Sequence, residues 1–127
     1  MTDFLVDSTV HIHWARGFGP AVDWLDGHAI DELNTSVISI AEVYSGASPS
    51  QLDQWPSYFR QFKVIGIDEE IAVFAGELRY GLARQGYQIH LPDALIAATA
   101  ILRAATVVTA NAKDFVITGA QVFELSP

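Results

Sequence analysis

The sequence predicts an α/β fold in which helices cover both faces of a central parallel sheet of four to five strands, giving a three-layer sandwich. Short apolar runs rich in β-branched residues recur along the chain, and because each is too short for a helix, each predicts a buried strand. Longer segments with the apolar spacing of helices separate these runs, and strands that alternate with helices form parallel sheets. The length of 127 residues fits one domain over residues 1–127.

The expected strands follow the apolar runs in chain order. Four of the runs predict buried strands, and these are residues 4–6, 37–38, 64–67 and 106–109. The last run, residues 121–125, alternates apolar and polar side chains and is expected to form an edge strand.

Four segments between the runs predict helices. Residues 68–86 place their apolar side chains in one stripe, and residues 92–104 are apolar on nearly all sides, as in a helix buried on more than one side. Residues 21–32 and 48–62 also favour helices. Pro56 is expected to kink or break the second of these, because proline removes a helical hydrogen bond.

The net charge of −8 comes from 15 acidic residues against 7 lysines and arginines. Proteins that bind nucleic acids by neutralising phosphates are usually basic, so the charge alone argues against RNA or DNA. It suits a protein that gathers carboxylates around Mg²⁺ or Mn²⁺, which choose oxygen ligands. The absence of cysteine excludes thiolate metal sites and agrees with a cytoplasmic location. No run approaches the ~20 apolar residues of a membrane span, so no membrane association is expected.

Four acidic residues are expected at one edge of the sheet. Asp7 ends the first strand, Glu42 follows the second and Asp114 follows the fourth. Asp93 lies in the first turn of the helix over residues 92–104, which is joined so closely to the next strand that it must begin at the carboxyl edge. Ligands bind outside this edge in parallel sheets. Carboxylates crowded there would repel one another, which suggests a cation between them.

Each acid taken alone has a structural alternative. Ser39 and Glu42 match a capping box, and an acid in the first turn of a helix is favoured by the helix dipole. Capping does not, however, require all four acids to lie at the ends of elements that face one crevice. The four acids are therefore candidate catalytic residues.

The histidines are not assigned to the site. His11 and His13 are two residues apart, so on a helix they face different ways and make a poor metal pair. His28 and His90 are isolated. All four are expected to be surface histidines or histidines with satisfied hydrogen bonds.

The segments that carry the four acids resemble the four signature blocks of PIN domains, and in particular of VapC-like toxins. The blocks read FLVDST at 4–9, ISIAEVYSG at 38–46, LPDALIAATA at 91–100 and VTANAKDF at 108–115. Each block alone is weak evidence for the family. The order and spacing of the four blocks agree with the family pattern, and the resemblance covers essentially the whole chain. Two positions depart from the family pattern: Ser8 stands where threonine is frequent, and Ala110 where a larger or basic residue is frequent.

The resemblance implies an endoribonuclease that hydrolyses RNA phosphodiester bonds with Mg²⁺ or Mn²⁺ and serves as the toxin of a toxin–antitoxin pair. It implies an acidic pocket made of Asp7, Glu42, Asp93 and Asp114. Asp7 and Asp93 would bind the metal directly, and the other two would bind a second ion or position water. Three more residues would position water or substrate: Ser8, Asn111 and Lys113.

The resemblance also implies protein partners. A small antitoxin would inhibit the chain, with an inserted Arg or Lys standing in for the metal charge, and a homodimer would form a higher-order hetero-oligomer with it. The alternatives are a receiver-like signalling domain and a PIN-like scaffold without activity. A receiver would need paired acids after the first strand, where only Asp7 stands. A scaffold would be expected to lose some of the four acids, and none is missing.

Overall fold

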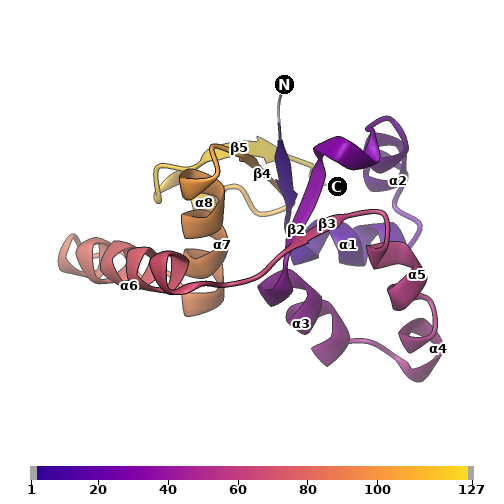
Figure 1. Cartoon of the computed structure of the whole chain (residues 1–127), viewed down its shortest axis with the longest axis horizontal. Helices are drawn as coiled ribbons and strands as arrows, with labels where there is room; N and C mark the ends of the chain where they lie inside the picture. Colours follow the sequence, from indigo (N-terminus) through magenta and orange to yellow (C-terminus); the bar gives the residue numbers. More distant parts are fainter. Residues whose placement is uncertain (1–2, 126–127) are drawn as a thin grey trace.

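The computed structural model describes residues 3–125 and confirms an α/β sandwich around a parallel sheet (Figure 1). The described sheet has five strands in the order β3-β2-β1-β4-β5, and every neighbouring pair is parallel. The predicted edge position of the last strand is confirmed. The strands are β1 (Phe4–Val6), β2 (Leu33–Ser36), β3 (Lys63–Ile65), β4 (Thr106–Thr109) and β5 (Gln121–Glu124).

The second strand was predicted at the wrong place. Residues 37–38 do not form it; they begin helix α3 (Val37–Ser45) directly after β2. The helix begins there because the Ser36 hydroxyl accepts a hydrogen bond from the backbone N–H of Ile38, at 3.0 Å. The predicted capping box of Ser39 and Glu42 is also wrong, since Ser39 lies inside α3.

Strand β2 is buried although three of its four residues are polar. The Asn34 amide donates to the backbone carbonyls of Phe4 and Glu32, and the Thr35 hydroxyl donates to the carbonyl of Val6. These bonds satisfy the polar groups inside the protein, so burial costs little. A search for apolar runs therefore misses this strand.

Short helices fill the first half of the chain. Helix α1 (Ser8–Ala15), which was not predicted, follows β1 directly. The predicted helix at 21–32 divides into α2 (Gly19–Asp26) and a 3₁₀ turn η1 (Ile30–Glu32). The predicted helix at 48–62 divides into α4 (Pro49–Leu52) and α5 (Trp55–Phe59). Pro56 lies near the start of α5, where its missing N–H is tolerated.

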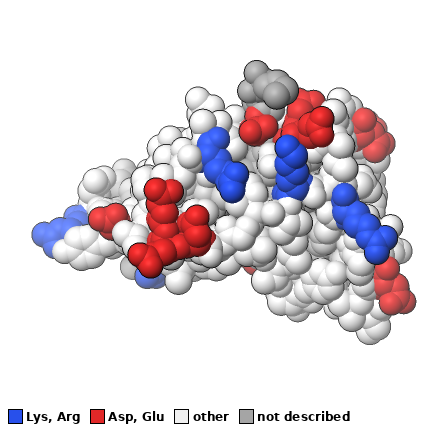
Figure 2. All heavy atoms as spheres, in the orientation of Figure 1, with Lys and Arg blue, Asp and Glu red and all other residues white. Residues whose placement is uncertain are grey.

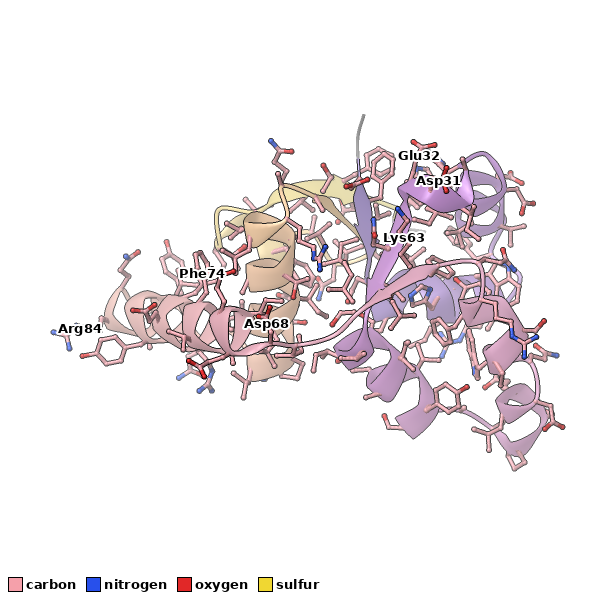
Figure 3. The ribbon with its side chains drawn as sticks, in the orientation of Figure 1. Asp31, Glu32, Lys63, Asp68, Phe74 and Arg84 are labelled. Atoms are coloured by element: carbon pink, nitrogen blue, oxygen red, sulfur yellow. The ribbon has the colours of Figure 1, made fainter. Side chains whose placement is uncertain are left out.

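The two long predicted helices are confirmed with small shifts at their ends. Helix α6 (Glu69–Arg84) begins after Asp68, whose carboxylate accepts the backbone N–H of Ile71 at 2.9 Å, and α7 is Leu91–Leu102. The apolar stripe of α6 packs on α7, and the far end of α6, with Arg84, extends away from the sheet (Figure 3). A short helix α8 (Lys113–Val116) follows β4.

The sheet buries a separate apolar cluster on each face. In β1, Leu5 packs with α7 residues such as Ile96, whereas its neighbour Val6 packs with Val10 of α1 and aromatic residues of α5. This alternation is expected of a strand covered on both sides. Within residues 3–125, no helix has the length and apolar character needed to cross a membrane.

Candidate active site

Asp7 lies at the carboxyl end of β1 and is buried, with only 3% of its surface exposed. It occupies the N-cap position of α1, but its side chain makes no capping hydrogen bond. Instead, the hydroxyls of Thr9 and Thr109 both donate to Oδ2, each at 2.9 Å. Burial raises the pKa of the Asp7 carboxyl, while the two hydroxyls oppose that shift. The Asp7 carboxylate is therefore held by the hydroxyls of Thr9 and Thr109 and does not cap α1.

Glu42 is half-buried on α3, one turn beyond the start of that helix. The Ser8 hydroxyl donates to Glu42 Oε1 at 3.2 Å and so connects Glu42 to the residue that follows Asp7. Burial raises the pKa of the Glu42 carboxyl, and the negative charge of Asp7 raises it further.

Asp93 lies in the first turn of α7, and the charges of the other three acids act on its carboxyl group. Its pKa is raised to about 6, mainly by burial and then by the charges of Asp7, Glu42 and Asp114, while His90 opposes the shift. The helix begins at the carboxyl edge of the sheet, as the sequence predicts. The structure therefore brings all four acids into one neighbourhood.

Asp114 lies at the start of α8 and is held by Asn111, whose amide donates to its Oδ2. Asp93 and Asp114 line the same small hollow, of about 110 Å³, together with His90. Lys113 is exposed beside Asp114. The predicted site residues on this loop thus lie close to the acids.

The two threonines that hold Asp7 were not predicted from the sequence. The Thr9 hydroxyl also accepts the backbone N–H of Ala110, and the Thr109 hydroxyl accepts that of Asn111. The pair therefore joins the loop after β4 to the start of α1. Thr109 could have been found from its position, because it is a polar residue at the carboxyl end of a strand next to β1.

His11 is completely buried away from the acids and has satisfied hydrogen bonds. Its Nδ1 lies 2.6 Å from the Tyr58 hydroxyl and its Nε2 lies 2.9 Å from the Thr35 hydroxyl. Burial lowers the pKa of His11 to about 3, so the ring is neutral. The interpretation of His11 as a structural histidine agrees with these contacts.

The donor groups at this edge suit a hard divalent cation. The four acids offer carboxylate oxygens, which Mg²⁺ and Mn²⁺ prefer, and their mutual repulsion favours a cation among them. In the side-chain conformations seen within residues 3–125, no three acidic or histidine side chains are close enough to hold one ion. Ion binding would therefore require rotation of the half-buried acids Glu42, Asp93 and Asp114 toward the fixed Asp7.

The chain is similar to known proteins over most of its length. Residues 4–119 match the model of the PIN domain family. A relative from Mycobacterium tuberculosis, Ribonuclease VapC10, is 36% identical over 112 residues, which cover 87% of this chain and 84% of that protein. A toxin–antitoxin complex from Klebsiella pneumoniae contains a chain that is 31% identical, with a TM-score of 0.78, and the match covers 97% of this chain and 100% of that one.

A further solved structure has the same fold at lower sequence identity. The DNA-bound VapBC structure from Salmonella typhimurium contains a chain with a TM-score of 0.86 and 23% identity, covering 98% of both chains.

Proposed function

Because this chain belongs to the PIN domain family, we propose that it is a metal-dependent endoribonuclease and the toxin of a toxin–antitoxin pair, acting in the cytoplasm as one domain over residues 1–127. The observation that carries this proposal is the convergence of four acids: Ser8, next to Asp7, bonds Glu42, and Asp93 and Asp114 line one hollow. The raised pKa of Asp93 beside the charges of the other three agrees with this arrangement. The similarity to a named VapC ribonuclease supports RNA as the substrate.

The proposed roles are those that the resemblance to PIN domains implies for each acid. Asp7 and Asp93 bind Mg²⁺, or Mn²⁺, and Glu42 and Asp114 bind a second ion or orient the attacking water. A divalent cation bound there lowers the pKa of water and stabilises negative charge on the phosphate. The hydroxyls of Thr9 and Thr109 both donate to Asp7 Oδ2 and would hold this carboxylate in place for an ion.

Three neighbours complete the proposed site. Ser8 and Asn111 position Glu42 and Asp114 through the hydrogen bonds that they donate to these carboxylates. Lys113 is exposed beside the acids, and its ammonium group is suited to bind a phosphate of the substrate.

The proposed partner is a small antitoxin protein. Relatives of similar structure occur in toxin–antitoxin complexes, and the acidic edge would accept an inserted Arg or Lys in place of a metal ion. A hollow of about 220 Å³ between α1, α3 and Trp55 of α5 presents the partly exposed Ile12, Ala15 and Ala47 to an apolar partner side chain. We propose that the chain forms a homodimer, and a higher-order hetero-oligomer with the antitoxin.

Cleavage of RNA tests this function directly. Purified protein, freed of any partner, should cut RNA in the presence of Mg²⁺ or Mn²⁺, and EDTA should stop the reaction. Asp93→Asn should be inactive while its circular dichroism spectrum matches that of the unmodified chain. Cleavage that survives chelation would contradict the metal mechanism, and a folded protein that cuts no RNA would favour the scaffold alternative.

A further inference from the structure

A groove runs along the exposed side of α6, outside the candidate active site. Its volume is about 650 Å³, and it reaches from the middle of α6 to the start of α7. We call it the α6 groove and define it by the residues Gly76, Arg79, Tyr80, Ala83, Tyr87 and Leu91. Tyr80 and Tyr87 present aromatic surface to solvent there, with 65% and 49% of their surfaces exposed.

The α6 groove differs in charge from the rest of this acidic molecule. None of the described residues that line it is acidic, although the chain carries a net charge of −8. Arg79 lines it, and Arg84 lies beside it with its guanidinium 5.5 Å from the centre of the Tyr80 ring. The acids of α6 gather on another side of the helix, where Glu69, Glu70 and Glu77 line a separate hollow (Figure 2). The α6 groove is therefore suited to a ligand that carries negative charge.

Both tyrosines are held in position. Gly86 adopts a φ of 91°, which only glycine takes readily, and the backbone N–H of Tyr87 then bonds the carbonyl of Leu82 at 2.9 Å. This bond fixes the direction in which the chain leaves α6. The Tyr80 hydroxyl accepts a hydrogen bond from Arg84 at 3.0 Å. The Tyr80 ring, which Arg84 holds, therefore loses less freedom when a flat group stacks on it than a free ring would.

The α6 groove is continuous with the candidate active site. Gln88, Ile89 and His90 line both the groove and the small hollow that contains Asp93 and Asp114. Arg79 donates from Nε to the carbonyl of Ile89 at 2.9 Å, which fixes its guanidinium against this shared wall. A chain-like ligand bound at the carboxylates could thus continue along the groove.

We propose that the α6 groove binds the single-stranded RNA next to the bond that is cut, with bases stacked on Tyr80 and Tyr87 and a phosphate bound by Arg79. This inference rests on the proposed ribonuclease function. Stacking on aromatic side chains accepts any base and requires bases that are not paired, so the groove selects single strands over duplexes. The arginines add phosphate contacts to the one proposed for Lys113 at the acidic edge.

Binding of a labelled RNA tests the groove. The inactive full-length Asp93→Asn chain is titrated into a fluorescent single-stranded RNA of mixed sequence, and the dissociation constant is read from anisotropy. Tyr87→Ala should raise that constant about 10-fold, which is the loss typical of one stacked base. Gly76→Leu should have a similar effect by filling the groove, and the backbone there has room for a Cβ, which meets no heavy atom within 4 Å.

Two variants on the same helix serve as controls. Gly81→Leu adds the same side chain at a glycine that also has open space but does not line the groove. Val73→Ala removes apolar surface from a residue that is 54% exposed and lies on the acidic side of α6. Neither should change RNA affinity. The same RNA in duplex form should bind more weakly. Tyr87→Ala should not change the dissociation constant of this duplex.

The outcomes separate this inference from the proposed function. If the unmodified chain cuts RNA but neither Tyr87→Ala nor Gly76→Leu weakens binding, the groove is not an RNA site and the ribonuclease function stands. If the chain cuts no RNA, the function itself fails. A change in oligomeric state by light scattering, with unchanged RNA affinity, would show that a second copy of the chain occupies the groove and would overturn the proposal.

Discussion

At the scale of single residues, Asp7 combines a buried carboxylate with a proposed metal-binding role that needs its negative charge. Desolvation of this carboxylate lowers the stability of the folded state, and the hydrogen bonds from the hydroxyls of Thr9 and Thr109 only partly offset this loss. Stability and activity therefore make opposite demands on residue 7, and a neutral side chain of the same shape should separate them.

We predict that Asp7→Asn abolishes RNA cleavage and leaves the free energy of unfolding without metal unchanged or higher. The asparagine carbonyl can still accept the two threonine hydroxyls, while the repulsion of Glu42 and Asp93 is relieved. Urea denaturation and a cleavage assay measure the two effects. The exposed Asp53→Asn should change neither. A variant that unfolds would show instead that Asp7 is needed for structure.

His11 gives a second prediction at this scale. Its pKa is about 3 in the folded protein and about 6.5 when unfolded, so the unfolded state takes up the proton first as the pH falls. The stability that the neutral ring contributes is complete above pH 6.5 and is lost toward pH 3. Between pH 7.5 and pH 5 the loss from this group should be about 2 kcal/mol.

The measurement of this loss needs a suitable background. The raised pKa of Asp93 acts in the opposite direction, because protonation of Asp93 below about pH 6 favours the folded state. Urea midpoints should therefore be compared in the Asp93→Asn chain, where His11→Gln should flatten the dependence on pH. Tyr58 stays neutral in this range, since burial raises its pKa. If the urea midpoint depends on pH equally strongly with and without His11, the low pKa assigned to His11 is wrong.

At the scale of elements, the start of α3 decides where Glu42 lies. Ser36 ends β2, and its hydroxyl caps α3 through the N–H of Ile38. We predict that Ser36→Ala destabilises the protein by about 1 kcal/mol, the usual loss for a helix cap, and lowers cleavage because α3 positions Glu42. The melting temperature measures the loss of stability, and the rate of RNA cleavage measures the loss of activity. Ser57→Ala, at an exposed serine of α5, should leave both unchanged.

The same junction shows what the sequence could and could not predict. Asp7, Asp93 and Asp114 were placed at this edge because each follows or begins an element whose type is clear from its apolar pattern, whereas Glu42 was placed after a strand at residues 37–38 that is in fact the start of α3. The position of β2 was missed because its polar side chains are satisfied by hydrogen bonds to Phe4, Glu32 and Val6, which depend on the tertiary structure. Thr9 and Thr109 were missed for the same reason, since their partner Asp7 is known only once β1 and β4 are paired.

At the scale of the whole molecule, a chain with net charge −8 places four carboxylates at one edge of its sheet. Without a cation, repulsion and burial at this edge oppose folding, as the raised pKa values of Asp7, Glu42 and Asp93 record. A cation that binds only the folded state must therefore stabilise the whole chain. This coupling makes metal binding measurable without any RNA.

We predict that Mn²⁺ or Mg²⁺ raises the free energy of unfolding, by about 2.7 kcal/mol when the ion is present at about 100 times its dissociation constant. Calorimetry measures the shift in melting temperature, with NaCl at matched ionic strength as the control for general screening of charge. Asp7→Asn and Asp93→Asn should melt at temperatures that no longer respond to the ion, because each loses a proposed ligand. The exposed Asp53→Asn should respond as the unmodified chain does. An equal response in all four chains would place the ion elsewhere on the acidic surface and remove the metal from the proposed site.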